Sequence, residues 1–426
     1  MILNISIIFC FFMFFLSIIN EQKILNPITV FFGEWFVVLF LSKLKLFGIL
    51  EVPNNIYGLI LIGCFAYAIG FYGYAFLSKH VSFYSKKNLN YKLNQKIVYT
   101  LAILTLLFFF IDFAKSAGSL MSGGLAALRL QAQNGSFLSG NSLLNALRIL
   151  IFAPFSLALS AVAPAHLFFS EDKNRIRLFI VTLLIMLERL FSDGGRSPVI
   201  YLMFSFMICY FFSLTPKRRP VALSLQISKR KLYIYILVIF AIVLLYEVTL
   251  SRSGSNALRD TYYYFAMEPV MFNKWSNIVE SNGLMAYGMA SFNGILFAFF
   301  YILKNILGLS TPLYWESIYS IIEGLGTQWQ TITYGGLQAN SYASIFWTFY
   351  FDGRTLGIIL GMLLYGIFVS IVYKRALNST NQKNAAIYSL VLIGVFYTFQ
   401  QLVFQNIYYS IAFLMLLFLF FKKVTR

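Results

Sequence analysis

Residues 97–113 read IVYTLAILTLLFFFIDF, an apolar run with a single acidic residue near its end. A helix of about 20 such residues crosses the hydrocarbon core of a bilayer. Comparable runs recur along the chain, in which 59% of the residues are hydrophobic and only 11% are charged. A water-soluble domain of this size does not have that composition, and the strands of a membrane β-barrel would alternate in polarity. The sequence therefore predicts an all-α, polytopic membrane protein.

The apolar runs predict about eleven transmembrane helices, within a range of roughly 10–14. They are expected near 2–19, 28–42, 56–77, 97–113, 143–169, 176–192, 198–214, 232–250, 342–373, 384–404 and 407–421. We interpret residues 2–19 as a retained first span, because no basic segment precedes the run and no small-residue cleavage site follows it. The whole chain, 1–426, is expected to form a single integral membrane domain.

Basic residues lie in the segments that should face the cytoplasm. Lys and Arg gather in 78–96, 170–177, 215–231, 374–383 and 422–426. With a cytoplasmic tail, the eleven-span arrangement puts all five segments on the same side, as the positive-inside rule requires. The net charge of +18 is therefore a topology signal, and we expect no nucleic-acid partner.

Three segments should face outward: 114–142, 193–197 and 251–341. The last is far longer than an ordinary connection. Its part at 285–303 is apolar enough to span, but a single crossing there would reverse the sides of the basic segments that follow. We therefore expect a re-entrant or interfacial helix near 285–306.

Arginines mark these outward segments, where the topology rule disfavours them. They are Arg129, Arg196, Arg252 and Arg259. A guanidinium keeps its charge and presents a fork of donors that matches phosphate oxygens. The alternative is that each arginine merely reaches lipid headgroups from the end of a span. Arg196 stands among glycines that allow close backbone approach, so an anionic ligand is the favoured interpretation there.

Aromatic and acidic residues accompany the last of these arginines. If the stretch Asp260-Thr261-Tyr262-Tyr263-Tyr264-Phe265 is helical, Arg259 meets Tyr263 one turn on. The tyrosines are either sugar platforms or part of an ordinary aromatic belt. Asp260 and Glu268 are candidate bases for a glycosyl transfer, and either is alternatively a counter-ion to Arg259.

Other kinds of site find little support. The three cysteines are scattered and the two histidines, His80 and His166, are far apart, so we expect no metal site and no cofactor. No phosphate-binding loop or dinucleotide fingerprint is present, and too few histidines exist for a Ser-His-Asp arrangement.

Taken together, these segments resemble the Wzy-type polymerases of O-antigen and capsule repeat units. The resemblance rests on Arg129 in the first outer loop, on Asp193-Gly194-Gly195-Arg196-Ser197 between two spans, and on the stretch Arg252–Phe265. It also rests on Asn340-Ser341-Tyr342-Ala343 and on Asp352-Gly353-Arg354-Thr355-Leu356-Gly357, in which Asp-Gly replaces the family's commoner Asp-Phe-Gly.

The resemblance implies a GT-C-like glycosyltransferase of the bacterial inner membrane, with 251–341 as one large periplasmic loop. It would join repeat units carried on undecaprenyl pyrophosphate for lipopolysaccharide or capsule, using neither nucleotide sugar nor an essential metal. Together with the two candidate bases, the predicted catalytic residues are Arg196, Arg259, Asp260 and Glu268. The implied substrate-binding residues are Arg129, Arg252, Tyr262, Tyr263, Asn340, Tyr342 and Asp352. Expected partners are the lipid-linked oligosaccharide, membrane lipid, a Wzz-type chain-length regulator and a Wzx-type flippase.

Two alternatives stay open. A lipid-linked oligosaccharide flippase, or another transporter, would place its ionisable residues near the middle of the membrane. An O-antigen ligase would use the same donor with a different acceptor. For Asp352 a structural alternative also exists, because it stands where a helix over 355–373 would take an N-terminal cap.

Overall fold

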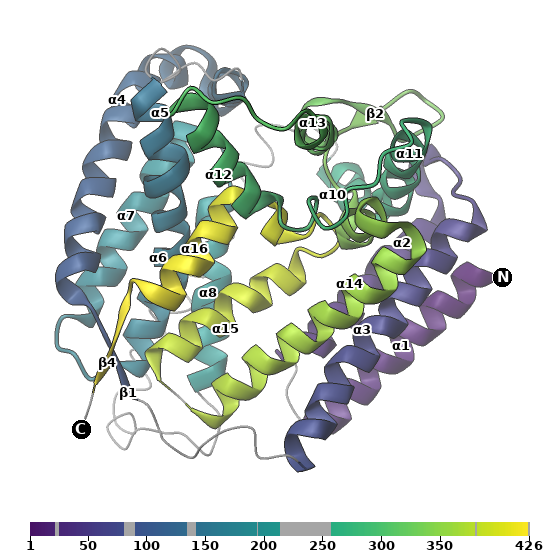
Figure 1. The fold of residues 1–426 in the computed structure, drawn as a ribbon, viewed down its shortest axis with the longest axis horizontal. Coiled ribbons are helices and arrows are strands. Elements are labelled where there is room, and N and C mark those ends of the chain that lie inside the picture. The colour runs from purple at the N-terminus through teal and green to yellow at the C-terminus, as the bar shows by residue number, and fades with distance from the viewer. Residues whose placement is uncertain are drawn as a thin grey trace. The chain divides into compact units, whose positions relative to one another are not determined.

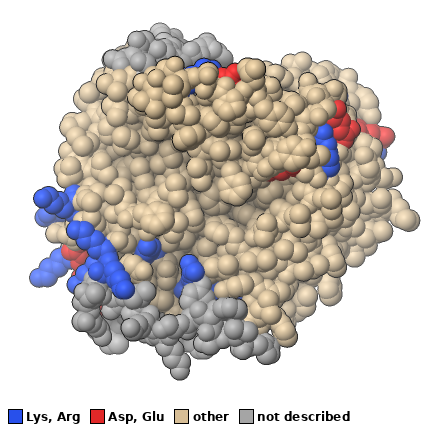
Figure 2. All heavy atoms as spheres, viewed as in Figure 1, with Lys and Arg blue, Asp and Glu red and all other residues tan. Residues whose placement is uncertain are grey.

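The computed structural model describes residues 1–21, 25–80, 90–133, 142–193, 195–213, 257–379 and 381–424. Helices make up most of these residues, and six are long and apolar enough to cross a membrane. These six begin at Ile2, Pro27, Asn54, Gln95, Leu143 and Ser344. Many large apolar side chains are exposed on them, and the face seen in Figure 2 carries few charged residues. These features confirm an all-α, multi-pass membrane protein.

The chain divides into two units, and the division falls within the last two apolar helices. Unit 1 contains residues 1–87, 258–377 and 394–410, and unit 2 contains residues 88–257, 378–393 and 411–426. Each unit is described by itself.

Unit 1 is built on four long helices that lie side by side in Figure 1: α1 (Ile2–Glu21), α2 (Pro27–Leu44), α3 (Asn54–His80) and α14 (Ser344–Asn378). The start of α2 shows a local signal that fixes it. The Asn26 side chain accepts a hydrogen bond from the Thr29 amide at 2.9 Å, and Pro27 occupies the first helical position, where a missing N–H costs nothing.

Glycines allow α3 and α14 to touch backbone to backbone. A Cβ atom on Gly70 would lie 2.2 Å from the Leu363 carbonyl oxygen, and one on Gly366 would lie 2.5 Å from the Tyr67 carbonyl oxygen. Small residues at such a crossing let membrane helices approach closely enough for extensive van der Waals contact.

The predicted outer loop is itself largely helical. Its described part contains α10 (Ala257–Ala266), α11 (Glu268–Ser281), α12 (Asn293–Asn305), α13 (Leu313–Thr327) and a hairpin of β2 (Gln330–Thr331) and β3 (Gln338–Ala339). The helix predicted near 285–306 corresponds to α12, which follows a turn and spans only 13 residues. At 1.5 Å per residue it is about 20 Å long, too short to cross a bilayer. It exposes Ile295 and Phe299 and buries Asn293 and Gly294.

Helix α14 covers the span predicted over 342–373, and it begins at Ser344 and continues through a kink, so that no separate helix starts at 355. The kink lies at Gly353 and at Arg354, which has a φ of 53°. The Arg354 guanidinium donates to the carbonyl oxygens of Val279 (3.3 Å) and Leu284 (2.9 Å) and lies over the Tyr350 ring. These contacts with the end of α11 hold the left-handed backbone in place.

Unit 2 contains the remaining helices and a short sheet. They are β1 (Asn90–Leu93), α4 (Gln95–Gln133), α5 (Ser142–Leu147), a π-helical turn η2 (Arg148–Phe152), α6 (Ala153–Phe169), α7 (Arg175–Asp193), α8 (Ser197–Ser213), most of α15 (Gln382–Phe396) and α16 (Ile407–Phe418), and β4 (Phe421–Val424). Within the unit, α4 packs on α7, and α6 packs on α7 and α8.

Unit 2 brings together the basic segments that were predicted to share a side. Strand β1 pairs antiparallel with β4, so that Lys92 lies opposite Lys422. Gln95 bonds to Asp172 in the 170–177 connection, and Lys383 lies over the ring of Tyr91, 4.7 Å from its centre. Parts of 78–96, 170–177, 374–383 and the tail therefore meet at one end of the unit, as the positive-inside interpretation requires.

Predicted spans generally coincide with helices, but one ends early. The span expected over 384–404 stops at Phe396. The chain then turns, and the carbonyl oxygens of Thr398 and Gln400 accept hydrogen bonds from the Ile345 and Ser344 amides at 2.8 and 3.1 Å. Those bonds to the start of α14 replace helical ones. The predicted span 232–250 lies outside the described residues.

Candidate functional site

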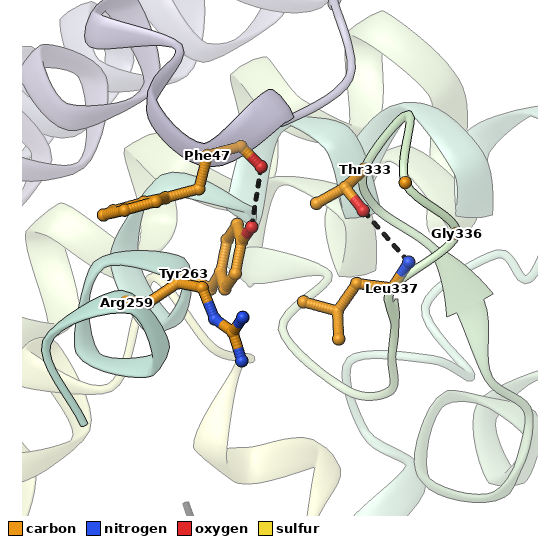
Figure 3. A pocket seen from close by; sticks show the side chains of 7 residues that line it. Phe47, Arg259, Tyr263, Thr333, Gly336 and Leu337 are labelled. Carbon is orange, nitrogen blue, oxygen red and sulfur yellow. Dashed lines mark hydrogen bonds between the residues drawn. The ribbon is translucent and has the colours of Figure 1, made fainter. Parts of the chain in front are cut away.

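A pocket of about 530 Å³ opens in unit 1 between α10, the hairpin and the loop that follows α2. Its lining residues are Phe47, Arg259, Tyr263, Thr333, Gly335, Gly336 and Leu337. The volume falls within the roughly 300–1,000 Å³ of typical small-molecule sites. Figure 3 shows the Arg259 side chain extending from α10 into the space between Tyr263 and Leu337.

The loop and the hairpin hold each other through their backbones. The Leu50 amide donates to the Ile332 carbonyl oxygen, and the Tyr334 amide donates to the Gly48 carbonyl oxygen, both at 2.9 Å. At the tip of the hairpin the Thr333 hydroxyl accepts the Leu337 amide at 3.0 Å, and Gly336 adopts a φ of 82°, which suits glycine. Two walls of the pocket are therefore fixed relative to each other.

Helix α10 supplies the charge of the pocket. Its formation confirms the expected helical stretch, and Arg259 and Tyr263 line the pocket together, one turn apart. Arg259 Nε lies 3.5 Å from Asp260 Oδ1, and the Arg259 side chain is 40% exposed. This contact favours the counter-ion interpretation of Asp260. The terminal guanidinium nitrogens make no hydrogen bond with the described residues, so they are available to an anion.

Two of the three tyrosines of α10, Tyr262 and Tyr263, anchor the loop after α2. The Tyr262 hydroxyl accepts the Leu46 amide at 2.9 Å and donates to the Leu41 carbonyl oxygen at 3.0 Å. The Tyr263 hydroxyl donates to the Phe47 carbonyl oxygen at 2.8 Å. Burial raises the pKa of both hydroxyls, and nearby Arg259 opposes this effect at Tyr263. Of the two, only Tyr263 lines the pocket. The Tyr262 hydroxyl is already used as both a donor and an acceptor to the backbone.

Asn340 and Tyr342, both predicted to bind substrate, are not among the residues that line the pocket. Asn340 donates to the Gly326 carbonyl oxygen at 2.7 Å. The Tyr342 ring packs against Tyr264 of α10 and against Phe399, both at 5.7 Å between ring centres. Ser341, Tyr342 and Ser344 all have positive φ values, which is an unusual local concentration of the strain often found at functional sites.

The Asp352 carboxylate is hydrogen-bonded to a neighbouring turn. Its carboxylate accepts hydrogen bonds from the amides of Gly288, Ala290 and Ser291 at 2.9–3.1 Å, and also from the Ser291 hydroxyl. Asp352 therefore caps the segment before α12. The sequence had instead suggested that it caps the start of its own helix over 355–373. The sequence could not reveal this partner, because about sixty residues separate the two segments.

Glu268, at the start of α11, is fully buried, and neither carboxyl oxygen has a hydrogen-bond partner of normal geometry among the described residues. Burial raises the pKa of this carboxyl well above its usual range, and the nearby Ser344 hydroxyl offsets part of the effect. A second buried acid, Glu34 on α2, interacts with it electrostatically. Glu34 was missed in the sequence, although a lone acid inside the apolar run 28–42 was a usable signal.

Of the other predicted arginines, only Arg196 is described with its side chain. Arg196 belongs to unit 2, where its carbonyl oxygen accepts the Ile200 amide in the first turn of α8 at 3.1 Å. Arg129 belongs to α4, and its side chain is outside the description; Arg252 is outside the described residues altogether. The expected meeting of these arginines with Arg259 stays a prediction. Within the described ranges, no three His, Cys, Asp or Glu side chains gather as metal ligands.

The fold and the pocket together define a class: a multi-pass α-helical membrane protein with a folded segment, 257–341, that carries a cationic, aromatic-walled pocket. Comparison with known proteins goes no further, since no family model, no curated protein and no solved structure matches the chain.

Proposed function

We propose that the chain is a polymerase of undecaprenyl-pyrophosphate-linked repeat units of O-antigen or capsule, acting at the periplasmic face of the bacterial inner membrane. It transfers the growing glycan to the non-reducing end of a new repeat unit. The observation that carries this proposal is the Arg259 pocket, which is built on the segment predicted to face outward. A flippase or a ligase is the alternative.

The chemistry of the transfer matches the composition of the pocket. A hydroxyl oxygen of the acceptor sugar attacks the anomeric carbon of the donor, and a new C–O bond forms. The bond from that carbon to the pyrophosphate oxygen breaks, and the bonding electrons leave with undecaprenyl pyrophosphate. Negative charge therefore grows on the phosphate, which a preorganised guanidinium stabilises. The hydroxyl proton passes to a base, for which Asp260 beside Arg259 and the buried Glu268 are the candidates.

The aromatic walls support a sugar ligand beside the phosphate. Phe47 and Tyr263 flank the arginine, with ring centres 6.2 Å apart in an edge-to-face arrangement. Sugar rings present apolar C–H faces that pack on aromatic rings, while their hydroxyls need polar partners, here Thr333 and the backbone of the glycine turn. The lipid tail would lie among the apolar helices, and a Wzz-type regulator and a Wzx-type flippase would act beside this protein.

The test uses cells that lack the chain and receive variants of it. Arg259→Ala is expected to leave the protein in the membrane but to reduce surface glycan from a ladder to a single repeat unit. Arg259→Lys, which keeps the charge and loses the fork of donors, should shorten the ladder. Lys304→Ala is the matched control, because Lys304 is an exposed cation paired with Glu316 outside the pocket.

Other outcomes count against the proposal. A normal ladder in Arg259→Ala cells would remove the pocket from the reaction. Loss of all surface glycan when the chain is deleted would indicate a flippase. Full-length glycan left on its lipid carrier would indicate a ligase.

A further inference from the structure

Two acidic side chains lie in the interior of unit 1, where the start of α14 meets the turn after α15. Glu268 is 0% exposed and Glu34 is 8% exposed. They are close enough to repel each other electrostatically. Three of their four carboxyl oxygens have no hydrogen-bond partner of normal geometry among the described residues. Buried carboxyl groups are normally paired or fully hydrogen-bonded, so this arrangement calls for an explanation.

The two acids differ in the donors that reach them. The Thr398 hydroxyl donates to Glu34 Oε2 at 3.3 Å, and the same hydroxyl accepts the Trp35 indole N–H at 3.1 Å. A backbone group at Phe399 also bonds to Glu34. Burial disfavours a negative charge on both acids, and the donors at Thr398 and Phe399 make that charge less unfavourable on Glu34 than on Glu268.

Glu268 has less support, because only the Ser344 hydroxyl offsets the effect of its burial. Its neighbours are Ser344 on α14, Tyr57 and Cys64 on α3, and Glu34 on α2. None of these is a cation, and no Lys, Arg or His in the described part of the chain offsets the charge of either acid. An ionised Glu268 would be a desolvated charge facing a second one.

Further polar atoms without partners continue from Glu268 along the contact between α11 and α14. They are the indole nitrogens of Trp275 and Trp347, whose rings lie 6.2 Å apart, and the Ser276 hydroxyl. Trp275 is seven residues beyond Glu268, so it lies two turns further along the same face of α11. Polar atoms buried in this way are the usual partners of ordered water, which would connect Glu268 to the end of α11.

We propose that Glu34 and Glu268 form an acid pair that holds one exchangeable proton at neutral pH, with the proton on Glu268 and the negative charge on Glu34. Transfer of that proton to the Glu34 carboxylate leaves Glu268 ready to accept one from a hydroxyl group. If the chain transfers a glycan, Glu268 accepts the proton of the attacking hydroxyl; that step rests on the proposed function, whereas the acid pair does not.

The test is infrared difference spectroscopy of the full chain in lipid nanodiscs, titrated with pH. The chain has only 15 acidic side chains, so one protonated carboxyl group gives a resolvable C=O stretching band. The wild-type protein should show this band at neutral pH and lose it as the pH rises. Glu268→Gln should abolish the band, and Glu34→Gln should move its midpoint down by about one pH unit, because the neighbouring negative charge is gone.

Three controls make the outcome decisive. Glu316→Gln removes an acid that is already paired with Lys304, so the band should be unchanged. The Thr398→Val variant, which lacks the donor to Glu34, should lose the pair's asymmetry and alter the titration of the band. Circular dichroism at each pH shows that the variants remain folded.

Several results would overturn the acid pair: no band in the wild-type protein, a band that survives in Glu268→Gln, or an unchanged midpoint in Glu34→Gln. Loss of the band on adding sodium at constant pH would also overturn it, because a metal cation would then occupy the site. The two proposals can also be separated. If the infrared bands behave as expected but Glu268→Gln cells still make normal glycan ladders, the acid pair stands and Glu268 has no role in the transfer.

Discussion

Replacing Asp352 with alanine distinguishes a structural carboxylate from one that contacts substrate. The wild-type side chain accepts three backbone amides and one hydroxyl from the turn at 288–291. Alanine leaves all four donors without their acceptor. A stranded donor costs about 1–2 kcal/mol, so the three amides alone imply a loss of about 3–6 kcal/mol in the free energy of unfolding. The substitution changes Asp352 but leaves the donors of the turn in place, so these donors gain no new acceptor from the alanine.

The assay is thermal unfolding of the detergent-solubilised protein, followed by tryptophan fluorescence. A loss of this size should lower the midpoint by on the order of 10 °C. Ser291→Ala removes only the hydroxyl donor and should lower it by far less. Glu316→Ala, at an exposed position, controls for loss of a carboxylate in general.

The opposite result would refute the reasoning. If Asp352→Ala unfolds at the wild-type temperature and polymerisation is nevertheless lost, the carboxylate acts on the ligand, as the resemblance implied, and the hydrogen bonds to the turn are dispensable.

Three further outcomes follow from the structure. Gly70→Ala should destabilise the protein by about 1–3 kcal/mol through overpacking against the Leu363 carbonyl oxygen, whereas Gly73→Ala on the same helix, with nothing within 4 Å, should be neutral or stabilising in the same thermal assay. Tyr262→Phe should cost about 1–3 kcal/mol by stranding the Leu46 amide and losing a second bond, measured as a lower unfolding midpoint with membrane insertion unchanged. Because the folded pKa of Glu268 is raised above its usual value of 4.5, its contribution to stability is complete below pH 4.5 and is lost as the pH rises through the folded pKa; Glu268→Gln should flatten this decline, and an equal decline in both proteins would contradict the assignment.

Hydropathy and charge predict the spans and their sides because each of these features depends on the composition of a single segment. The run at 97–113 and the basic segments need only the contrast between lipid and water, and both predictions agree with α4 and with the basic end of unit 2. The end of α15 at Phe396 was not predictable in this way. No Pro or Gly occurs at 397–402, and just past the helix end the carbonyl oxygens of Thr398 and Gln400 accept amides of α14 in place of helical ones.

The site shows the same division. The pairing of Arg259 with Tyr263 follows from helical spacing and was predicted correctly. The partners of Asp352, the anchoring role of Tyr262 and the proximity of Glu34 to Glu268 depend on contacts between segments far apart in the sequence. A residue's type and local spacing indicate what chemistry it offers, but the tertiary fold decides which of its atoms are already used.

The contact of Gly70 with α14 has a consequence for motion. Backbones that touch leave no compliant side chains between them, so α3 and the second half of α14 should rotate and translate as one rigid body. Gly353 and Arg354, just before that half, are where α14 departs from helical geometry. Any movement that admits a bulky ligand beneath α11 should therefore hinge at this pair, with the α3–α14 contact as its fixed base.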